Sequence, residues 1–461
     1  MADKTTSEGI DLPGVGTATD WASQLRSNWS DLSSFLFQGD ASVLNADAIN
    51  PPAVSTEGTI NNRVQVGPGD DLATRITDAG AGGTLEFEPG TYTMDASPKS
   101  NQTWIVGSSV EFQPASDAAA LNLTDVTGVS FQGTLKLTDS DGTTGAGTQI
   151  LKLDGAQRCS FDRVWIQEPN VGIQTFSSNR NCELNEFESI LIVDAANEYL
   201  KVNGETNDNQ FGDVLIWGAG DGASGSGTDG IRWSTNNKDG GNVFDALSVI
   251  GVGGTGFSIT DLNNELWVGA AILDANGADG IKFSPSSVSN RALSIESLWV
   301  GGNAGEGIHL DGTSTHPISG VQIGILRCEG NALKGARFEH LKDSFIGSII
   351  AKNNDAGVRF DNAGNAGVVV GHVHTESNTV TGLDGPGVSD HVHIGKARVE
   401  DSATLTDFTT VGGTGEESAS AETPTAGDFF TGDIVDFTDS DDGSGTGVYL
   451  KNINGNWTQL A

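Results

Sequence analysis

The sequence predicts an all-β protein that folds as a parallel β-helix, and three observations lead to this fold class. The 461 residues include 63 glycines, and Val, Ile, Phe and Thr occur in short runs bounded by Gly, Asn and Asp, as in proteins with many short strands. Two short phrases alternate along the chain at a spacing of roughly 23 to 33 residues, the range of solenoids and propellers. Neither phrase can bury its apolar side chains except against the next copy. A propeller would need longer four-stranded meanders, whose turn signals are missing here.

The longer phrase reads apolar-[Gly/Asp/Glu]-x-apolar-x-apolar and predicts one strand in each turn. Positions are counted from the first apolar residue of the phrase, Phe161 in the first copy. The third and fifth residues after it, Val164 and Ile166, are predicted to face the core, and the fourth, Trp165, is predicted to face outward. The copies are FDRVWI from Phe161, FESILI from Phe187, FGDVLI from Phe211, FDALSV from Phe244, VGAAIL from Val268, IESLWV from Ile295, IGILRC from Ile323, IGSIIA from Ile346, VGHVHT from Val370 and IGKARV from Ile394.

The shorter phrase begins with glycine and predicts a second strand in each turn. Its copies are GIRW at Gly230, GFSI at Gly256, GIKF at Gly280, GIHL at Gly307, GARF at Gly335 and GVRF at Gly357. Period-2 alternation places a mostly basic column on the outside of these strands. The column consists of Lys201, Arg232, Ser258, Lys282, His309, Arg337 and Arg359.

The entry to the repeats carries a family resemblance. The stretch "GGTLEFEPGTYTM" from Gly82 to Met94, after the amphipathic "DDLATRITDAG", resembles the opening of the pectin-lyase-like superfamily. That resemblance implies a right-handed, single-stranded β-helix over residues 64–402, with a short helix capping the first turn. It implies little about chemistry, because such scaffolds host lyases, hydrolases and pure binding proteins.

The first 63 residues are expected to form a separate attachment segment. In "TDWASQLRSNWSDLSSFLF", apolar residues follow one another at near-helical spacing behind the potential N-cap Asp20. The apolar residues proposed to contact a partner are Trp21, Leu25, Trp29 and Leu32. The segment resembles the N-terminal part of tailed-virus fibre proteins, which joins the fibre to a tail or baseplate protein. The alternative is an ordinary amphipathic helix packed on the cap of the solenoid.

Residues 403–461 are expected to hold a linker and a small β module. The closing "TGDIVDFTDSDDGSGTGVYLKNINGNWTQLA" resembles the terminal modules of the same tail proteins, and the chain begins without a pattern typical of a secretion signal. Together the three parts resemble a homotrimeric virion tail spike or fibre that attaches to the host surface. The alternatives are a polysaccharide depolymerase, lyase or glycoside hydrolase, on the same scaffold, and a purely structural tail or baseplate component.

The net charge of the chain indicates the environment in which the protein works. The formal net charge is −37, from 61 acidic and 24 basic residues spread along the chain. Such a charge repels nucleic acid and keeps a protein soluble when salt screens it. It favours a halophilic, haloarchaeal virus and an extracellular, high-salt location over an acidic mesophilic protein. We expect no membrane insertion, no cofactor and no metal. The three cysteines are too few and too far apart for a disulfide framework and are predicted to be buried thiols.

Two outward columns are candidate binding surfaces. The fourth position of the long phrase is largely apolar, and Trp165, Leu191, Leu215 and Ile272 are predicted to contact other subunits or the protein's own loops. The basic column would bind an acidic host-surface glycan or a glycosylated surface layer through Lys201, Arg232, Lys282, His309, Arg337 and Arg359, with Trp233 and Trp299 offering planar faces to sugar rings. The alternative is that its charges pair with acids of a neighbouring subunit or of adjacent loops.

The later turns hold the candidates for catalysis. A glycosidase needs two carboxylates across a cleft, and a lyase needs a base near a cation. The available residues are His374, Glu376, Glu329 and Glu400; the alternative is that they form salt bridges between turns. The HVH sequences at 372–374 and 391–393 offer a metal site only if they stack in adjacent turns.

Overall fold

The computed structural model describes residues 62–94, 96–115, 119–139, 149–218, 228–234, 240–262, 265–286, 290–361, 364–385 and 392–400, and four short strands after them. All of these belong to one unit, Asn61–Ala461. The predicted attachment helix with Trp21, Leu25, Trp29 and Leu32 lies outside the described residues.

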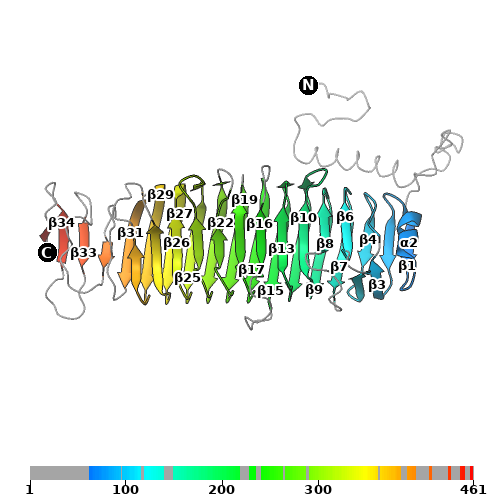
Figure 1. The fold of residues 1–461 in the computed structure, drawn as a ribbon, viewed down its shortest axis with the longest axis horizontal. Coiled ribbons are helices and arrows are strands. Elements are labelled where there is room, and N and C mark those ends of the chain that lie inside the picture. Colours follow the sequence, from blue (N-terminus) through cyan, green and yellow to red (C-terminus); the bar gives the residue numbers. More distant parts are fainter. Residues whose placement is uncertain are drawn as a thin grey trace, which may run out of the picture. The chain divides into compact units, whose positions relative to one another are not determined.

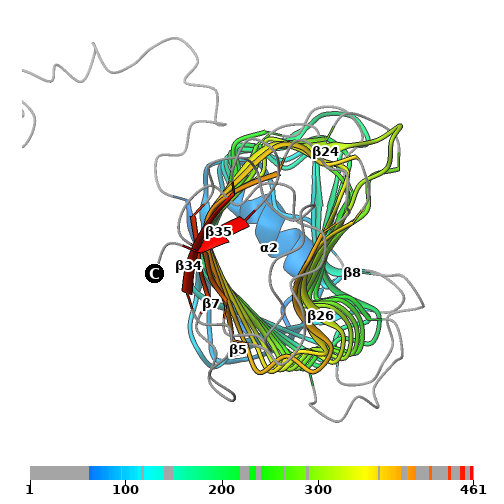
Figure 2. The same cartoon turned by 90° about the vertical axis from the view of Figure 1, so that its left-hand side faces the viewer.

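The described residues form a right-handed parallel β-helix, as the sequence predicts (Figure 1). The long-phrase strands make one parallel sheet, here called sheet 1, and the short-phrase strands make a second, sheet 2. Figure 2 shows the two sheets on opposite sides of the core. From β4 to β30 each turn contributes one strand to each sheet, so both sheets are extended by stacking.

Sheet 1 contains β1 (Arg63–Val66), β2 (Thr84–Phe87), β4 (Thr103–Val106), β7 (Ser130–Thr138), β9 (Ser160–Gln167), β12 (Glu186–Val193), β15 (Gln210–Trp217), β17 (Asn242–Ile250), β19 (Leu266–Asp274), β22 (Leu293–Gly301), β25 (Gln322–Glu329), β27 (Leu341–Lys352), β29 (Ala366–Glu376) and β31 (Val392–Glu400). Four shorter strands join it at the sides: β3 (Gly90–Met94), β5 (Val110–Pro114), β21 (Asn290–Arg291) and β24 (Ile318–Ser319).

Sheet 2 contains β6 (Leu121–Thr124), β8 (Gln149–Asp154), β10 (Val171–Phe176), β13 (Glu198–Asn203), β16 (Ile231–Ser234), β18 (Phe257–Asp261), β20 (Ile281–Phe283), β23 (Ile308–Asp311), β26 (Lys334–Glu339), β28 (Ala356–Asp361) and β30 (Thr381–Asp384). The two-residue strands β11 (Cys182–Glu183) and β14 (Thr206–Asn207) pair beside the main sheets. All ten long phrases and all six short phrases fall on the predicted strands.

The predicted alternation of inward and outward side chains is confirmed for the second half of the long phrase but is wrong for its start. Val164 and Ile166 are buried as predicted, yet Phe161 is buried too, where strict alternation would turn it outward. The pairing explains this difference, because the register passes from Phe161 directly to Arg163 and leaves Asp162 unpaired. Two successive side chains therefore face solvent, and the first apolar residue joins the core.

Like residues stack on like residues through the core. The rings of Phe131, Phe161, Phe187, Phe211 and Phe244 form one column, with neighbouring centroids 4.4 to 5.4 Å apart. Their planes are within 15° of parallel, so each ring packs against the next turn over its whole face. Burial of such aromatic surface is the main stabilising contribution of each turn.

Asparagines stack in the same way at the corner that leads from sheet 1 to sheet 2. In each step the backbone N–H and the side-chain amide of one asparagine both donate to the Oδ1 of the asparagine in the next turn, as Asn303 does to Asn331 at 3.2 and 2.9 Å. The other amide hydrogen reaches a carbonyl oxygen, Leu273 O at 3.1 Å for Asn303. The column consists of Asn276, Asn303, Asn331, Asn354 and Asn378, all buried.

Glycine opens the short phrase because the next turn passes directly over it. A methyl group on Gly280 would lie 2.5 Å from Gly307 O, and one on Gly307 would lie 2.5 Å from Gly335 O. No side chain fits at that distance from a backbone oxygen, so these turns require glycine at the start of the phrase.

The start of the solenoid is closed by the described helix, α2 (Leu72–Ala79), as the family resemblance implied. Its N-cap Asp71 accepts a hydrogen bond from the backbone N–H of Thr74 at 3.2 Å. Leu72, Ile76 and Ala79 are buried, so the helix covers the apolar end of the first turn.

At the other end β32 (Gly415–Glu417) and β33 (Ile434–Phe437) continue sheet 1 in parallel. Strand β34 (Gly447–Lys451) then pairs antiparallel with β33 and with β35 (Trp457–Gln459). These four strands lie in the part of the chain for which a linker and a small β module are expected.

Cys159, Cys182 and Cys328 are free and buried thiols, as predicted, and burial raises the pKa of each.

We predict that Asn303→Ala lowers the free energy of unfolding by roughly 2–5 kcal/mol, because several buried donors and acceptors lose their partners at once. The exposed Gln322→Ala in sheet 1 is the control and should change it by no more than about 0.5 kcal/mol. Denaturant unfolding followed by circular dichroism measures both. Equal midpoints for the two variants would mean that the asparagine column contributes no stability.

Candidate functional site

The basic column of sheet 2 lies in one line, as the sequence predicts. Each member pairs directly with the next across neighbouring strands, for example Lys201 with Arg232 and His309 with Arg337. The same register carries the line through Ser258 and Lys282 and on to Arg359. We refer to these residues as the ladder.

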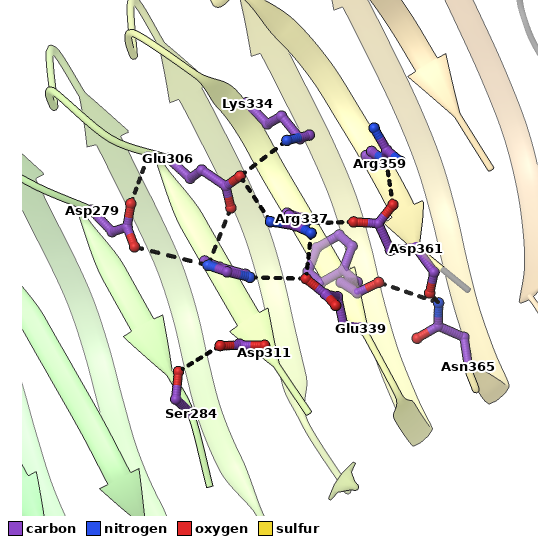
Figure 3. A network of polar contacts seen from close by, with 12 residues as sticks. Asp279, Ser284, Glu306, Asp311, Lys334, Arg337, Glu339, Arg359, Asp361 and Asn365 are labelled. Atoms are coloured by element: carbon purple, nitrogen blue, oxygen red, sulfur yellow. Dashed lines mark hydrogen bonds and ion pairs between the residues drawn. The ribbon is translucent and has the colours of Figure 1, made fainter. Parts of the chain in front are cut away.

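Acidic side chains flank the ladder on both sides. One set stands three residues before a ladder position: Glu198, Asp229, Asp279 and Glu306. The other stands two residues after it: Asp311, Glu339 and Asp361. Figure 3 shows several of these carboxylates, from successive strands, meeting the bases of the ladder. The ladder is therefore a mixed-charge surface.

Arg337 makes three ion pairs in this network. Its guanidinium lies 3.5 Å from Glu306, 2.7 Å from Glu339 and 2.5 Å from Asp361. Arg359 shares Asp361 and lies 3.5 Å from Asp384. Burial raises the pKa of Asp361, but the hydrogen bonds from the two arginines outweigh it and hold the pKa below the ordinary value of 3.8.

His309 lies between carboxylates on both edges of its ring. Its Nδ1 is 3.4 Å from Glu306 and 3.9 Å from Asp279, and its Nε2 is 3.1 Å from Glu339. Burial alone would lower the pKa of His309, but Asp279, Glu306 and Glu339 raise it above 6.5. At 8% exposure the imidazole is a buried part of the network and not an open binding group.

The remaining ladder residues follow the same pattern. Lys201 and Arg232 both pair with Glu198, at 3.3 and 3.1 Å. Arg232 and Arg359 keep exposed side chains, whereas Lys282 is half-buried. The charges of the ladder are thus paired, as the alternative interpretation holds. Their partners are carboxylates of the same chain, such as Glu198, Glu339 and Asp361.

The prediction that Trp233 offers a planar face to sugar rings is wrong. Trp233 is fully buried and packs edge-to-face on Phe244, because an outward Arg232 leaves its neighbour facing inward. Trp299 is half-buried on the outside of sheet 1 and not beside the ladder.

Three donors of the network can approach one cation. Ligand atoms of His309, Asp311 and Glu339 all lie within 4.8 Å of one another. The sequence analysis missed this group because its members come from two turns. The signal was present, however, since Asp311 follows His309 by two residues and Glu339 occupies the same place one turn later.

The outward face of sheet 1 carries exposed apolar side chains, which we call the apolar face. Of the predicted contact residues Leu215 and Ile272 are exposed, while Trp165 and Leu191 are half-buried. The neighbouring columns add large side chains that the sequence analysis did not single out. They are Trp217, Trp267, Ile325, Phe345 and Val369, each 40% exposed or more.

A groove of about 500 Å³ lies on this face, over β19, β22 and β25. Ala270 and Ser297 leave space on the sheet, and taller side chains border it. Those side chains are Ile272, Trp299, Ile325 and Arg327. The groove is therefore mainly apolar, with one guanidinium at its margin.

Two of the four catalytic candidates form ion pairs. Glu329 lies 2.7 Å from Arg327 of its own strand, and Glu376 pairs with Lys352 of the preceding turn. His374 is half-buried beside His372, their ring centroids 6.4 Å apart. The side chain of Glu400 lies outside the described residues. The Glu376–Lys352 pair matches the alternative of salt bridges between turns.

The two HVH sequences do not stack in adjacent turns, so the condition for a metal site there is not met. Strand β31 pairs Lys396 with His372 and Arg398 with His374, and His393 lies opposite Val369. His393 is therefore offset from His372 by three residues along the strands, and His391 is outside the described residues. Burial lowers the pKa of His372, and the nearby charges of His374, Lys396 and Arg398 lower it further.

No protein-family model matches this chain, nor does any curated protein or solved structure. Among the described residues no helix has the length and apolar character needed to cross a membrane.

We predict that Asp361→Asn lowers the free energy of unfolding by about 1.5–3 kcal/mol at neutral pH, since Arg337 and Arg359 lose a charged acceptor. A carboxyl group with a lowered folded-state pKa stabilises the fold above its unfolded pKa and loses this effect as the pH falls through the folded value. The difference between wild type and variant should therefore shrink below about pH 4. Denaturant midpoints measured from pH 7 to pH 3 test this, with the exposed Glu296→Gln as control. A difference that does not depend on pH would contradict the assignment.

Proposed function

We propose that this protein is a tail spike or fibre of a halophilic virus that attaches the virion to the host cell surface. The observation that carries the proposal is the apolar face, a broad exposed surface on an otherwise strongly acidic solenoid. The resemblance of the first 63 residues and of the closing module to tail proteins supports the same function.

An exposed apolar surface of this kind favours association with a partner. Single exposed apolar residues are ordinary, but here Leu215, Trp217, Ile272 and Ile325 project from one sheet across neighbouring strands. A second copy of the chain is the simplest partner, because it brings an identical face. High salt screens the repulsion between chains of net charge −37 and, with salting-out ions, strengthens apolar association. We therefore propose a homotrimer whose subunits meet through the apolar face.

Sheet 2 remains exposed in such an assembly, because it lies on the opposite side of the core (Figure 2). Its ladder presents Arg232 and Arg359 beside the carboxylates Glu198 and Asp361. Neighbouring donors and acceptors of this kind suit the hydroxyl groups of a sugar better than a dense anionic charge. We propose that the ladder binds a host-surface glycan or glycoprotein.

The deciding experiment is incubation of the purified protein with isolated haloarchaeal envelopes in molar salt. Co-sedimentation without release of reducing or unsaturated sugar ends is the expected result for an attachment protein. Release of sugar ends would favour the depolymerase and direct attention to the later turns. Absence of both would contradict the proposal for that host range, and sedimentation with envelopes of several hosts extends the test.

We predict that Ile325→Asp converts the assembly to monomers, because it places a charge in the middle of the apolar face. Light scattering coupled to size-exclusion chromatography in molar salt measures the mass. Val380→Asp is a matched control, since Val380 is 53% exposed and Ile325 52%, but Val380 lies outside sheet 1. A monomeric wild type, or an unchanged mass in Ile325→Asp, would overturn the trimer.

A further inference from the structure

We propose that His309, Asp311 and Glu339 bind a divalent transition-metal cation, and that Zn²⁺ suits this donor set best. The site joins two adjacent turns through β23 and β26. It is independent of the attachment function proposed above.

The first argument is geometric. His309 and Asp311 are two residues apart on β23 and so project from the same side of sheet 2, and Glu339 pairs with Asp311 on β26. One donor atom from each of the three side chains falls within a sphere small enough for one cation, since all lie within 4.8 Å of one another. Asp311 is held in place by a hydrogen bond from Ser284 at 3.0 Å.

The second argument is the setting of the imidazole. A histidine that binds a metal usually donates its other ring N–H to a carboxylate, which fixes the tautomer and the ring orientation. Here the Nδ1 edge of His309 faces Glu306 and Asp279, which leaves Nε2 on the side of Glu339. Glu306 is only 4% exposed, and its Oε2 has no hydrogen-bond partner, so a protonated Nδ1 is the donor that this oxygen requires.

The third argument is charge. Four carboxylates surround the ring: Asp279, Glu306, Asp311 and Glu339. The nearby bases are Lys334 and Arg337, which pair with Glu306 and Glu339, and Lys282, which acts on Asp279. With a neutral imidazole the carboxylates outnumber the bases, and a cation on Nε2 removes the excess negative charge. Protonation of His309 is the competing way to do so.

The choice of metal follows from the donors. Two carboxylate oxygens and one imidazole nitrogen suit Zn²⁺ and its neighbours in the first transition row, whereas Ca²⁺ and Mg²⁺ favour sites built from oxygen alone. The contacts of Glu339 with His309 and Arg337 both use Oε1, so Oε2 is the oxygen for the cation. Three protein ligands leave a coordination position for water or for a group of a bound partner.

Equilibrium dialysis of the full chain against Zn²⁺ in molar salt at pH 8 tests the site, because salt suppresses binding to scattered surface acids and the pH keeps imidazole free for metal. We expect one Zn²⁺ per chain, retained in excess Mg²⁺. Co²⁺ should bind in the same place with a visible absorption band that Zn²⁺ abolishes.

Variants separate the site from general metal binding. Asp311→Asn removes a ligand whose described contact is only with Ser284, so the fold should persist, and it should weaken Zn²⁺ binding at least tenfold, as should His309→Asn. Asp279 approaches the ring only at its Nδ1 edge and also accepts a hydrogen bond from the backbone N–H of Glu306, which an asparagine Oδ1 can still accept. Asp279→Asn should therefore keep the fold and weaken binding by about 10–100-fold. His316→Asn, outside the cluster, is the control and should bind as wild type does. Absence of stoichiometric Zn²⁺, or undiminished binding in folded Asp311→Asn, would overturn the proposal.

Discussion

The structure depends on one constraint, the exact stacking of each turn on the next in the same register. Every side chain in such a solenoid lies above and below the residue at the same position of the neighbouring turns, so each residue must pack on those two neighbours. A residue type can repeat along a column only if it packs well on its own kind. Asparagine meets this condition at the corners, because its amide group donates and accepts at the same time. Asn303 is bonded on both sides and leaves no polar atom unsatisfied. Phenylalanine meets the condition in the core by parallel stacking.

On the outside the same register creates a conflict for charged residues. Arg337 and Arg359 are direct neighbours in the pairing, and two like charges at the spacing of adjacent strands repel each other. The structure resolves the conflict with Asp361, which lies between them and bonds to both. The acidic columns beside the ladder are thus a consequence of the stacking. The environment of His309 arises in the same way, because the carboxylates that serve the neighbouring turns also surround its ring.

Much of the fold could be predicted from the sequence, because repetition shows which positions are equivalent. The strands, the capping helix and the line of the ladder all follow from aligning the phrases. The inward position of Trp233 was also predictable, because the alternation that turns Arg232 outward turns its neighbour inward. The ion pairs were harder to predict. Asp361 is distant from its partner Arg337 in sequence and becomes its neighbour only through the register of the strands. The extra width of the apolar face was missed for a different reason. Strict alternation does not foresee the bend near Phe161, which turns the residue before the first apolar position outward and adds the column of Trp267, Phe345 and Val369.

The two faces of the solenoid respond to salt in opposite ways, and this contrast connects the fold to the acidic composition. Exposed charge pairs weaken in salt, but pairs with buried partners are screened much less, and Glu306 and Asp361 are among the most buried acids of the ladder. Sheet 2 can therefore keep its arrangement in concentrated salt. The proposed association through sheet 1 would involve apolar surface, and screening would reduce the repulsion between strongly negative chains. A single register thus supports a face that retains its own charge pairs and a face of exposed apolar side chains, and both would suit the proposed high-salt medium.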